Sequence, residues 1–316
     1  MRLLIFAKTA LLLYMIALVF HFPVEAQELL APAATEQPVA DRAALLARLP
    51  LLEAEARAAG MRPDARIPYA ETLSSVGYHD LAAREYEALA VDFSDQPDYW
   101  LAAADAWMRV GPSGREPAFD ALNHLLSMDE DHIEAHALLA RLLHREGLYA
   151  LAEDAYEKTL QLQQEHVGAV IGLAVLRVRA GDIVESSAQI DALGVKAQPF
   201  DVETRLMLRK ALFDFEHCGG WLDDTAPNHA AYARLLYRAG RITDALLVSR
   251  RSVSLDPAQF ETWNFLAAMQ LQLGNVERAV EAYAKSLEAN ANQPNIAEAR
   301  KQLINQMTLE QRNKTP

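Results

Sequence analysis

The sequence predicts an all-α protein, an α-solenoid in which helix–turn–helix hairpins stack on one another. Three observations predict this fold class. The chain is rich in Ala and Leu, which favour helix over sheet. Glycines recur at a nearly constant distance, and an alanine lies seven residues before each of these glycines. A hairpin that buries its apolar side only against copies of itself forms an elongated stack rather than one globular core.

The recurring glycine separates two amphipathic stretches in each copy. In "EAHALLARLLHREGLYALAEDAYEKTLQL", residues 134–162, this glycine is Gly147. Successive glycines are 34, 36, 34, 59 and 34 residues apart. The spacing of 36 contains two extra residues near "GPSGREP", and the spacing of 59 is one period plus 25. The six glycines are Gly77, Gly111, Gly147, Gly181, Gly240 and Gly274.

The alanine column has a packing explanation. Where the two helices of a hairpin cross, only a small side chain lets the helix axes approach closely. Most copies carry a second small residue five positions after the glycine, as at Ala152, and a larger residue four positions further on, as at Tyr156. The six alanines that precede the glycines are Ala70, Ala104, Ala140, Ala174, Ala233 and Ala267.

These columns resemble the tetratricopeptide repeat, a 34-residue helix–turn–helix unit. The best copy, "FETWNFLAAMQLQLGNVERAVEAYAKSLEANANQ", carries Trp263, Leu266, Ala267, Gly274, Ala279 and Tyr283. The glycine that the family has at its eighth position is alanine in all copies here. The resemblance implies a right-handed solenoid with capping helices, in which four repeats span 63–200 and two span 226–293.

The remaining segments interrupt or flank the repeats. Residues 27–40 are expected to form a flexible leader, and 41–60 an N-terminal capping helix that Pro50 splits or restarts. Residues 201–225 break the period and predict an irregular helical insert or degenerate repeat. This segment is either a weak joint between two sub-stacks or a rigid decoration. Residues 294–316 predict a C-terminal capping helix and tail.

The N-terminus predicts export. Residues 1–26 combine two cations, an apolar run over 9–20 and the small residues Val24 and Ala26 before a cleavage point, which is the layout of a secretory signal peptide. The prediction is a periplasmic protein, with an inner-membrane anchor over 9–22 as the alternative. The chain has one cysteine, Cys218, and therefore no internal disulfide, which fits a bacterial periplasm.

The sequence carries no catalytic signature, and we predict a protein that is not an enzyme and uses no cofactor. His132 and His136 are four residues apart among carboxylates, a spacing that suits a metal on a helix, but they fall at a repeat junction where a solvated turn is expected. We therefore predict no metal site. Cys218 is interpreted as a small apolar residue rather than a nucleophile. The formal net charge of −13 argues against nucleic acid as a partner.

In the family that the repeats resemble, the first helices line a concave groove, and two sets of residues are candidates for binding there. Arg141 stands at one groove position. The thirteenth position of four repeats carries arginine, which either binds a carboxylate or phosphate ligand or, as we favour, complements the dipole of its own helix. These are Arg109, Arg145, Arg179 and Arg238. Ile171, Val175 and Val178 predict an apolar floor that either seats a partner helix or lipid or packs inside the stack.

The predicted function follows from these candidates. The leading hypothesis is a non-enzymatic scaffold that holds a peptide or helix of a partner protein in the groove, in an assembly of the bacterial envelope. The alternative is a periplasmic carrier that binds an apolar small molecule, such as a lipid, in the same groove.

Overall fold

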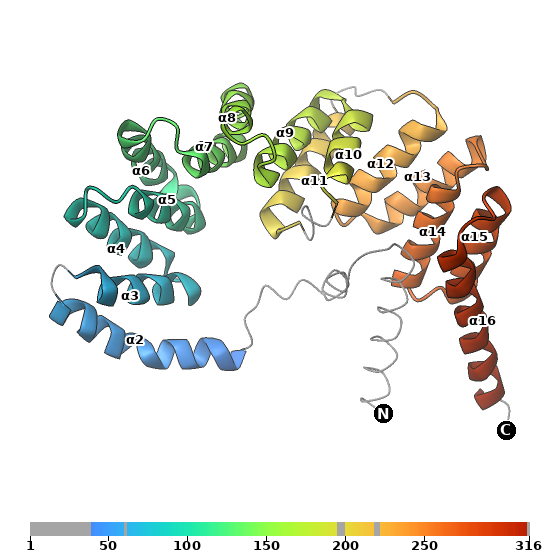
Figure 1. Cartoon of the computed structure of the whole chain (residues 1–316), viewed down its shortest axis with the longest axis horizontal. Coiled ribbons are helices and arrows are strands. Elements are labelled where there is room, and N and C mark those ends of the chain that lie inside the picture. Colours follow the sequence, from blue (N-terminus) through green and yellow to red (C-terminus); the bar gives the residue numbers. More distant parts are fainter. Residues whose placement is uncertain (1–38, 60–61, 195–199, 218–221, 315–316) are drawn as a thin grey trace. The chain divides into compact units, whose positions relative to one another are not determined.

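The computed structural model describes residues 39–59, 62–194, 200–217 and 222–314, and the regular elements in these ranges are helices (Figure 1). The all-α fold class is therefore confirmed. The signal segment, most of the leader and Cys218 lie outside the described residues. The chain divides into two compact units, an N-terminal unit up to Leu173 and a C-terminal unit from Ala174 onwards, and the boundary falls within one helix.

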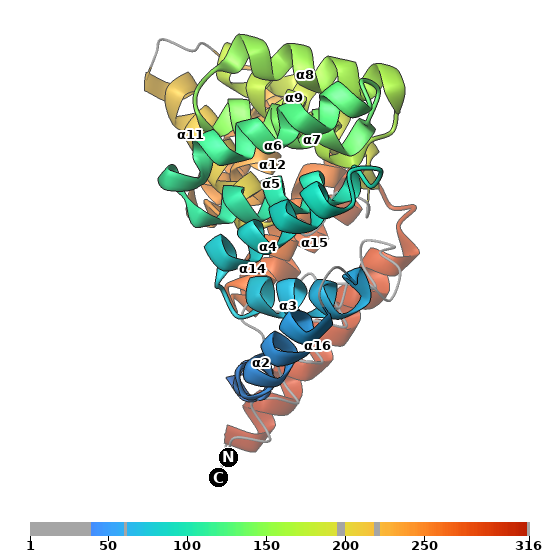
Figure 2. The same ribbon diagram turned by 90° about the vertical axis from the view of Figure 1, so that its left-hand side faces the viewer.

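The N-terminal unit consists of stacked hairpins, and each helix packs against its neighbours in sequence (Figures 1 and 2). The predicted repeats at 63–96, 97–132 and 133–166 each contain one hairpin. The elements are α2 (Val39–Ala59), α3 (Pro63–Ser75), α4 (His79–Asp92), α5 (Asp98–Val110), the short 3-10 helix η2 (Pro112–Gly114), α6 (Arg115–Met128), α7 (Ile133–Arg145), α8 (Tyr149–Leu162) and the first half of α9 (Val167–Ala180).

The C-terminal unit continues the same construction with one additional helix, α11. Helices α12 to α16 pack in sequence order, and the last of them follows the final hairpin as the sequence predicts. The elements are the second half of α9, α10 (Ile183–Ala192), α11 (Val202–His217), α12 (Ala226–Arg238), α13 (Ile242–Leu255), α14 (Phe260–Gln272), α15 (Val276–Ala289) and α16 (Pro294–Lys314).

The recurring glycines end the first helix of each hairpin. All six have positive φ angles, from 75° at Gly240 to 103° at Gly181, a region that costs other residues a steric penalty. After α3 the amide of Gly77 donates to the carbonyl of Ser74, and the next amide donates back to Leu73 at 2.8 Å. This pattern satisfies carbonyls at the helix end and turns the chain into the second helix. The six alanines seven residues earlier are all 0% exposed.

The N-terminal helix differs from its prediction at one residue. Helix α2 runs continuously through Pro50, which neither splits nor restarts it. Proline removes one backbone hydrogen bond, but its fixed φ angle is compatible with a helix. Beyond the proline, Leu52 and Ala56 are buried, and α2 packs against α3. This packing holds the helix together across the missing hydrogen bond.

Residues 201–225 are an insertion around which the repeat packing continues. In the first two repeats, Glu87 of α4 accepts a hydrogen bond from Trp107 of α5, 20 residues later. Asp191 on α10 stands at the same repeat position as Glu87. If the 25 inserted residues are added to the offset of 20, the partner of Asp191 is expected near residue 236. Arg234 and Arg238 of α12 flank that residue, and both form ion pairs of 2.8 Å with Asp191. Helices α10 and α12 therefore pack in the register of an uninterrupted repeat, and α11 is looped out.

One contact between α8 and α9 leaves no room for a side chain. Tyr156 of α8 is 0% exposed, and its ring lies against the backbone of α9 at Gly172. A Cβ atom at Gly172 would lie 2.2 Å from Cζ of this ring. The glycine therefore lets the tyrosine fill the crossing between the two helices.

We predict that Gly172→Ala lowers the free energy of unfolding by about 1–3 kcal/mol, because the buried ring cannot move away without disturbing the surrounding core. Gly168→Ala in the same helix is the matched control. Its added Cβ would meet only the side chain of His166, at 3.3 Å, and alanine is the better helix former. Urea denaturation followed by circular dichroism measures both variants, and equal stability of the two would contradict the packing argument.

Candidate functional site

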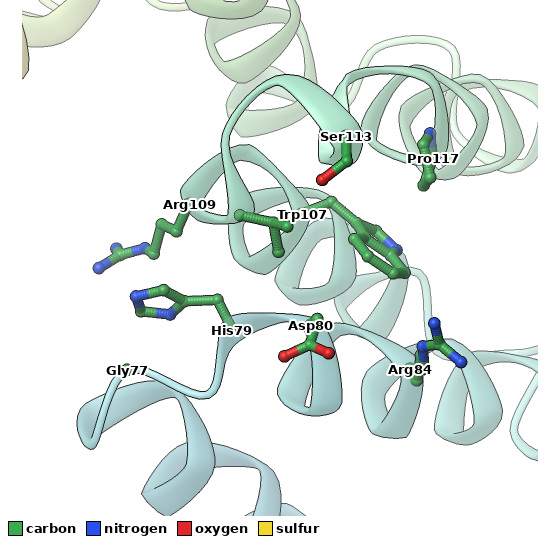
Figure 3. A pocket seen from close by; sticks show the side chains of 9 residues that line it. Gly77, His79, Asp80, Arg84, Trp107, Arg109, Ser113 and Pro117 are labelled. Carbon is green, nitrogen blue, oxygen red and sulfur yellow. The ribbon is translucent and has the colours of Figure 1, made fainter.

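A cleft in the N-terminal unit is the candidate site, and it lies over α4, α5 and α6 (Figure 3). Its volume is about 580 Å³. Helix α4 and the turn before it form one wall, the end of α5 forms the floor, and η2 with the start of α6 forms the opposite wall. The lining residues are Gly77, His79, Asp80, Arg84, Trp107, Arg109, Val110, Ser113 and Pro117.

The two-residue insertion after α5 shapes this cleft. Helix α5 ends at Val110, and Gly111 with φ 95° directs the chain into η2. Gly114 then lies so close to α5 that an added Cβ would be 2.0 Å from the carbonyl oxygen of Trp107. Only glycine permits this approach. The lengthened connection carries Ser113 and Pro117 to the opposite wall, so the spacing of 36 residues was the sequence signal for this site.

Trp107 and His79 contribute the two aromatic rings that line the cleft. The indole nitrogen of Trp107 donates to Oε1 of Glu87 at 2.7 Å, which fixes the ring, and the side chain is 8% exposed. Burial lowers the pKa of His79, and the charge of Arg109 lowers it further. The imidazole is therefore neutral at pH 7. Its Nδ1 atom is buried and has no hydrogen-bond partner among the described residues.

Charged groups surround these rings. Figure 3 shows Arg109 beside His79, and Asp80 and Arg84 follow along α4. Arg109 forms an ion pair with Asp105 one turn earlier, at 2.9 Å, while the side chain of Arg84 is exposed. The cleft thus offers two guanidinium groups, one carboxylate, a neutral imidazole and an indole wall. Such a set can bind a short polypeptide segment that has both acidic and apolar side chains.

A corresponding cleft exists in the C-terminal unit. It has a volume of about 430 Å³ and lies over α13, α14 and α15. Both clefts are formed by the second helix of one repeat together with the first and second helices of the next. An indole again belongs to the lining, and its nitrogen donates to the carbonyl of Pro257 at 3.0 Å. The lining residues are Arg250, Trp263, Leu266, Gln270, Arg278, Glu281, Ala282 and Lys285.

The four arginines at the thirteenth repeat position each have an intramolecular partner. Besides the ion pair of Arg109, Nη1 of Arg145 donates to the carbonyl of Met108 at 2.7 Å, at the end of the preceding first helix. Arg179 forms an ion pair with Asp214 on α11 at 2.9 Å.

Arg238 forms the ion pair with Asp191 and lies 5.5 Å from the ring centroid of Phe200. Arg141, on α7, is half-buried. Arg145, Arg179 and Arg238 therefore connect their helices to other helices, whereas the partner of Arg109 lies on its own helix.

The apolar residues predicted as a groove floor are buried. Ile171 is 8% exposed, and Val175 and Val178 are both 0% exposed. In the C-terminal unit, α11 packs at the end of α9, where an added Cβ at Gly181 would lie 3.8 Å from the ring of Phe215. The three residues therefore pack inside the stack, which is the second of the two arrangements that the sequence left open.

The paired histidines serve as hydrogen-bonding groups for the backbone. Nδ1 of His132 accepts from the amide of Ala135 at 3.2 Å and caps the start of α7, and His166 caps α9 in the same way. Nε2 of His136 lies 2.8 Å from the carbonyl of Glu130. Within the described ranges, no group of three or more His, Cys, Asp or Glu side chains is arranged to hold a metal ion.

The stacked hairpins, glycine turns and buried alanines define an α-helical repeat protein. The family model "Tetratricopeptide repeat" matches residues 133–166 and 260–293, two of the copies that the sequence spacing identifies. The chain therefore contains tetratricopeptide repeats at these two segments.

Several solved structures are similar to this chain. One is a tetratricopeptide repeat protein from Parabacteroides merdae, with 17% identity, 84% of this chain and 94% of the other covered, and a TM-score of 0.41. YrrB, described as having an unusual peptide-binding site, has 16% identity, 69% and 99% coverage and a TM-score of 0.31. MamA from Desulfovibrio magneticus RS-1 has 16% identity, 62% and 96% coverage and a TM-score of 0.32. No curated protein matches the chain.

We predict that the imidazole of His79 titrates below its usual pKa of about 6.5. The unfolded chain then binds this proton more tightly than the folded chain, so His79 makes the free energy of unfolding decrease as the pH falls below about 6.5. NMR titration of the ring measures the pKa directly. Denaturation at pH 7.5 and pH 5 should show a smaller loss of stability for His79→Gln than for the wild type. A His79 pKa above 6.5 would contradict the burial argument.

Proposed function

We propose that this protein is a non-enzymatic scaffold that binds a segment of a partner protein in the cleft over α4, α5 and α6. The observation that carries the proposal is the lining of that cleft, in which Arg84 and Arg109 stand near the indole of Trp107 and the imidazole of His79. A volume of about 580 Å³ holds a few side chains and not a folded domain. The ligand is therefore a short peptide segment.

The lining defines the chemistry of this segment. Arg84 and Arg109 favour an acidic side chain, because a hydrogen bond between two charged groups is stronger than a neutral one. Trp107 and Val110 favour an apolar side chain beside it. The neutral imidazole of His79 has one nitrogen that donates and one that accepts, so the ring adds a polar group to the wall of the cleft.

The alternative of an apolar carrier has no comparable support. The side chains that suggested it, Ile171, Val175 and Val178, are buried. Both clefts carry arginine side chains, which a purely apolar molecule would leave without compensating interactions. A peptide fits the lining better than a lipid does.

The location of the scaffold is a second proposal, and it rests on the sequence of residues 1–26. We infer export to the periplasm with cleavage after Ala26, and participation in an assembly of the bacterial envelope. Within the described part of the chain, no helix is long and apolar enough to span a membrane. An inner-membrane anchor over residues 9–22 remains the alternative arrangement.

The two arrangements give different fractionation results. We predict that the full chain expressed in a Gram-negative host appears in the periplasmic fraction and begins at Gln27 when the mature N-terminus is sequenced. Replacing Val24 and Ala26 together with Arg should block cleavage and leave a larger product on the membrane. A wild-type protein that keeps Met1 and stays with the membrane would support the anchor instead.

The peptide proposal is tested with a displayed peptide library selected on the purified protein. We predict that enriched peptides place Asp or Glu next to a large apolar residue, and that Arg84→Glu weakens their binding at least tenfold because it reverses a charge in the cleft. Arg48→Glu is the matched control, since Arg48 is an exposed arginine of α2 in the same unit and lies outside the cleft. Isothermal calorimetry measures both, and equal binding by the two variants would contradict this site.

A further inference from the structure

The inserted helix α11 has one face that the protein itself covers. This face packs against the C-terminal unit at the end of α9 and on α12, where Phe215 and Tyr232 lie edge to face with ring centroids 6.0 Å apart. Four apolar residues spaced by three or four positions form the covered face: Leu208, Ala211, Leu212 and Phe215. Each of them is at most 5% exposed. The helix is therefore firmly seated.

The opposite face of α11 is also apolar but exposed. Val202 is 47% exposed, Leu206 57% and Phe213 56%. Their spacing of four and seven residues places them on one side of the helix, along a single stripe. The ring of Phe213 stacks on His217, with centroids 3.9 Å apart, so the aromatic side chain is held in place while its surface remains accessible.

Exposed cations flank the apolar stripe of α11. Two carboxylates of the helix are already paired, since Asp214 pairs with Arg179 at 2.9 Å and Glu216 pairs with Arg241 at 2.7 Å. Arg209 and Lys210 are exposed beside the apolar stripe. The exposed face therefore combines apolar side chains with two cations, in a chain whose formal net charge is −13.

We propose that the outward face of α11 is a second docking surface and that its occupant is an acidic amphipathic helix of a partner protein. The apolar side of such a helix covers Val202, Leu206 and Phe213, and its flanking Asp or Glu side chains approach Arg209. An amphipathic helix laid on an apolar stripe is a common mode of protein recognition. This inference rests on the scaffold function proposed above and adds a different site in the other unit.

Charge complementarity favours this occupant over two others. In a symmetric contact between two copies, the same patch faces itself, so that Arg209 would approach its own counterpart. An anionic membrane attracts cations, but it would bring the acidic remainder of the chain towards a surface of the same sign. An acidic helix meets both the apolar and the cationic components of the face.

The test uses a designed 18-residue amphipathic peptide with a leucine stripe and glutamate flanks, and a second peptide in which lysine replaces each glutamate. Fluorescence anisotropy measures binding of each to the full mature chain. We expect the glutamate peptide to bind at least tenfold more tightly than the lysine peptide. Leu206→Asp and Phe213→Asp should each weaken its binding at least tenfold, and Arg209→Glu at least threefold.

Matched controls are available in the same unit. Leu247 on α13 is 70% exposed, and Lys301 on α16 is exposed, so Leu247→Asp and Lys301→Glu should bind the glutamate peptide as the wild type does. Circular dichroism melting verifies that all variants are folded. Peptides selected for the cleft should bind Leu206→Asp unchanged, so the two surfaces are measured separately.

Four outcomes would overturn the proposal. Equal binding of the two peptides, or unchanged binding by Leu206→Asp, would remove the acidic helix as the occupant. Flotation with phosphatidylglycerol vesicles but not with phosphatidylcholine vesicles, lost in Leu206→Asp, would assign the face to a membrane. Concentration-dependent dimerisation in sedimentation experiments, lost in the same variant, would assign it to a second copy of the chain.

Discussion

The close crossing of two helices within each hairpin is the constraint on which the rest of the structure depends. It requires a side chain no larger than a methyl group at the crossing, and the six alanines at this position have no exposed surface. It also requires the chain to turn sharply after the first helix, which the positive φ of the following glycine allows. Each hairpin can then present the same surface to the next, and stability accumulates from contacts between neighbours.

The regular positions of the repeats are largely occupied by interactions within the protein. Arg145 bonds to the backbone of the preceding first helix, and Arg238 is paired with Asp191 of the preceding second helix. Two of the surfaces described above occur where the repeat is irregular. The two extra residues after α5 shape a cleft, and the 25 extra residues before α12 supply a helix with an exposed apolar face. Both of these proposed binding surfaces thus depend on departures from the regular repeat.

The fold could be predicted from the sequence because its constraints are local. A methyl group at a crossing and a glycine at a turn are properties of single positions, and their recurrence can be counted. The lining of the cleft could not be predicted in this way, because His79 and Arg84 of α4 and Trp107 of α5 share no repeat position. Periodicity identifies an apolar face on α9 but does not say what covers it, so the sequence left open whether Ile171, Val175 and Val178 line a groove or pack inside the stack. Their burial shows that they pack inside.

The direct packing of α10 against α12 has a consequence for how the molecule unfolds. A disturbance in the fourth repeat reaches the fifth through Asp191 and its two arginines, without passing through α11. The hairpins on both sides of the insertion therefore hold each other directly, and local unfolding of one is transmitted to the other through this contact. Helix α11 is an addition to this contact, so substitutions on its exposed face leave the pairing of Asp191 unchanged.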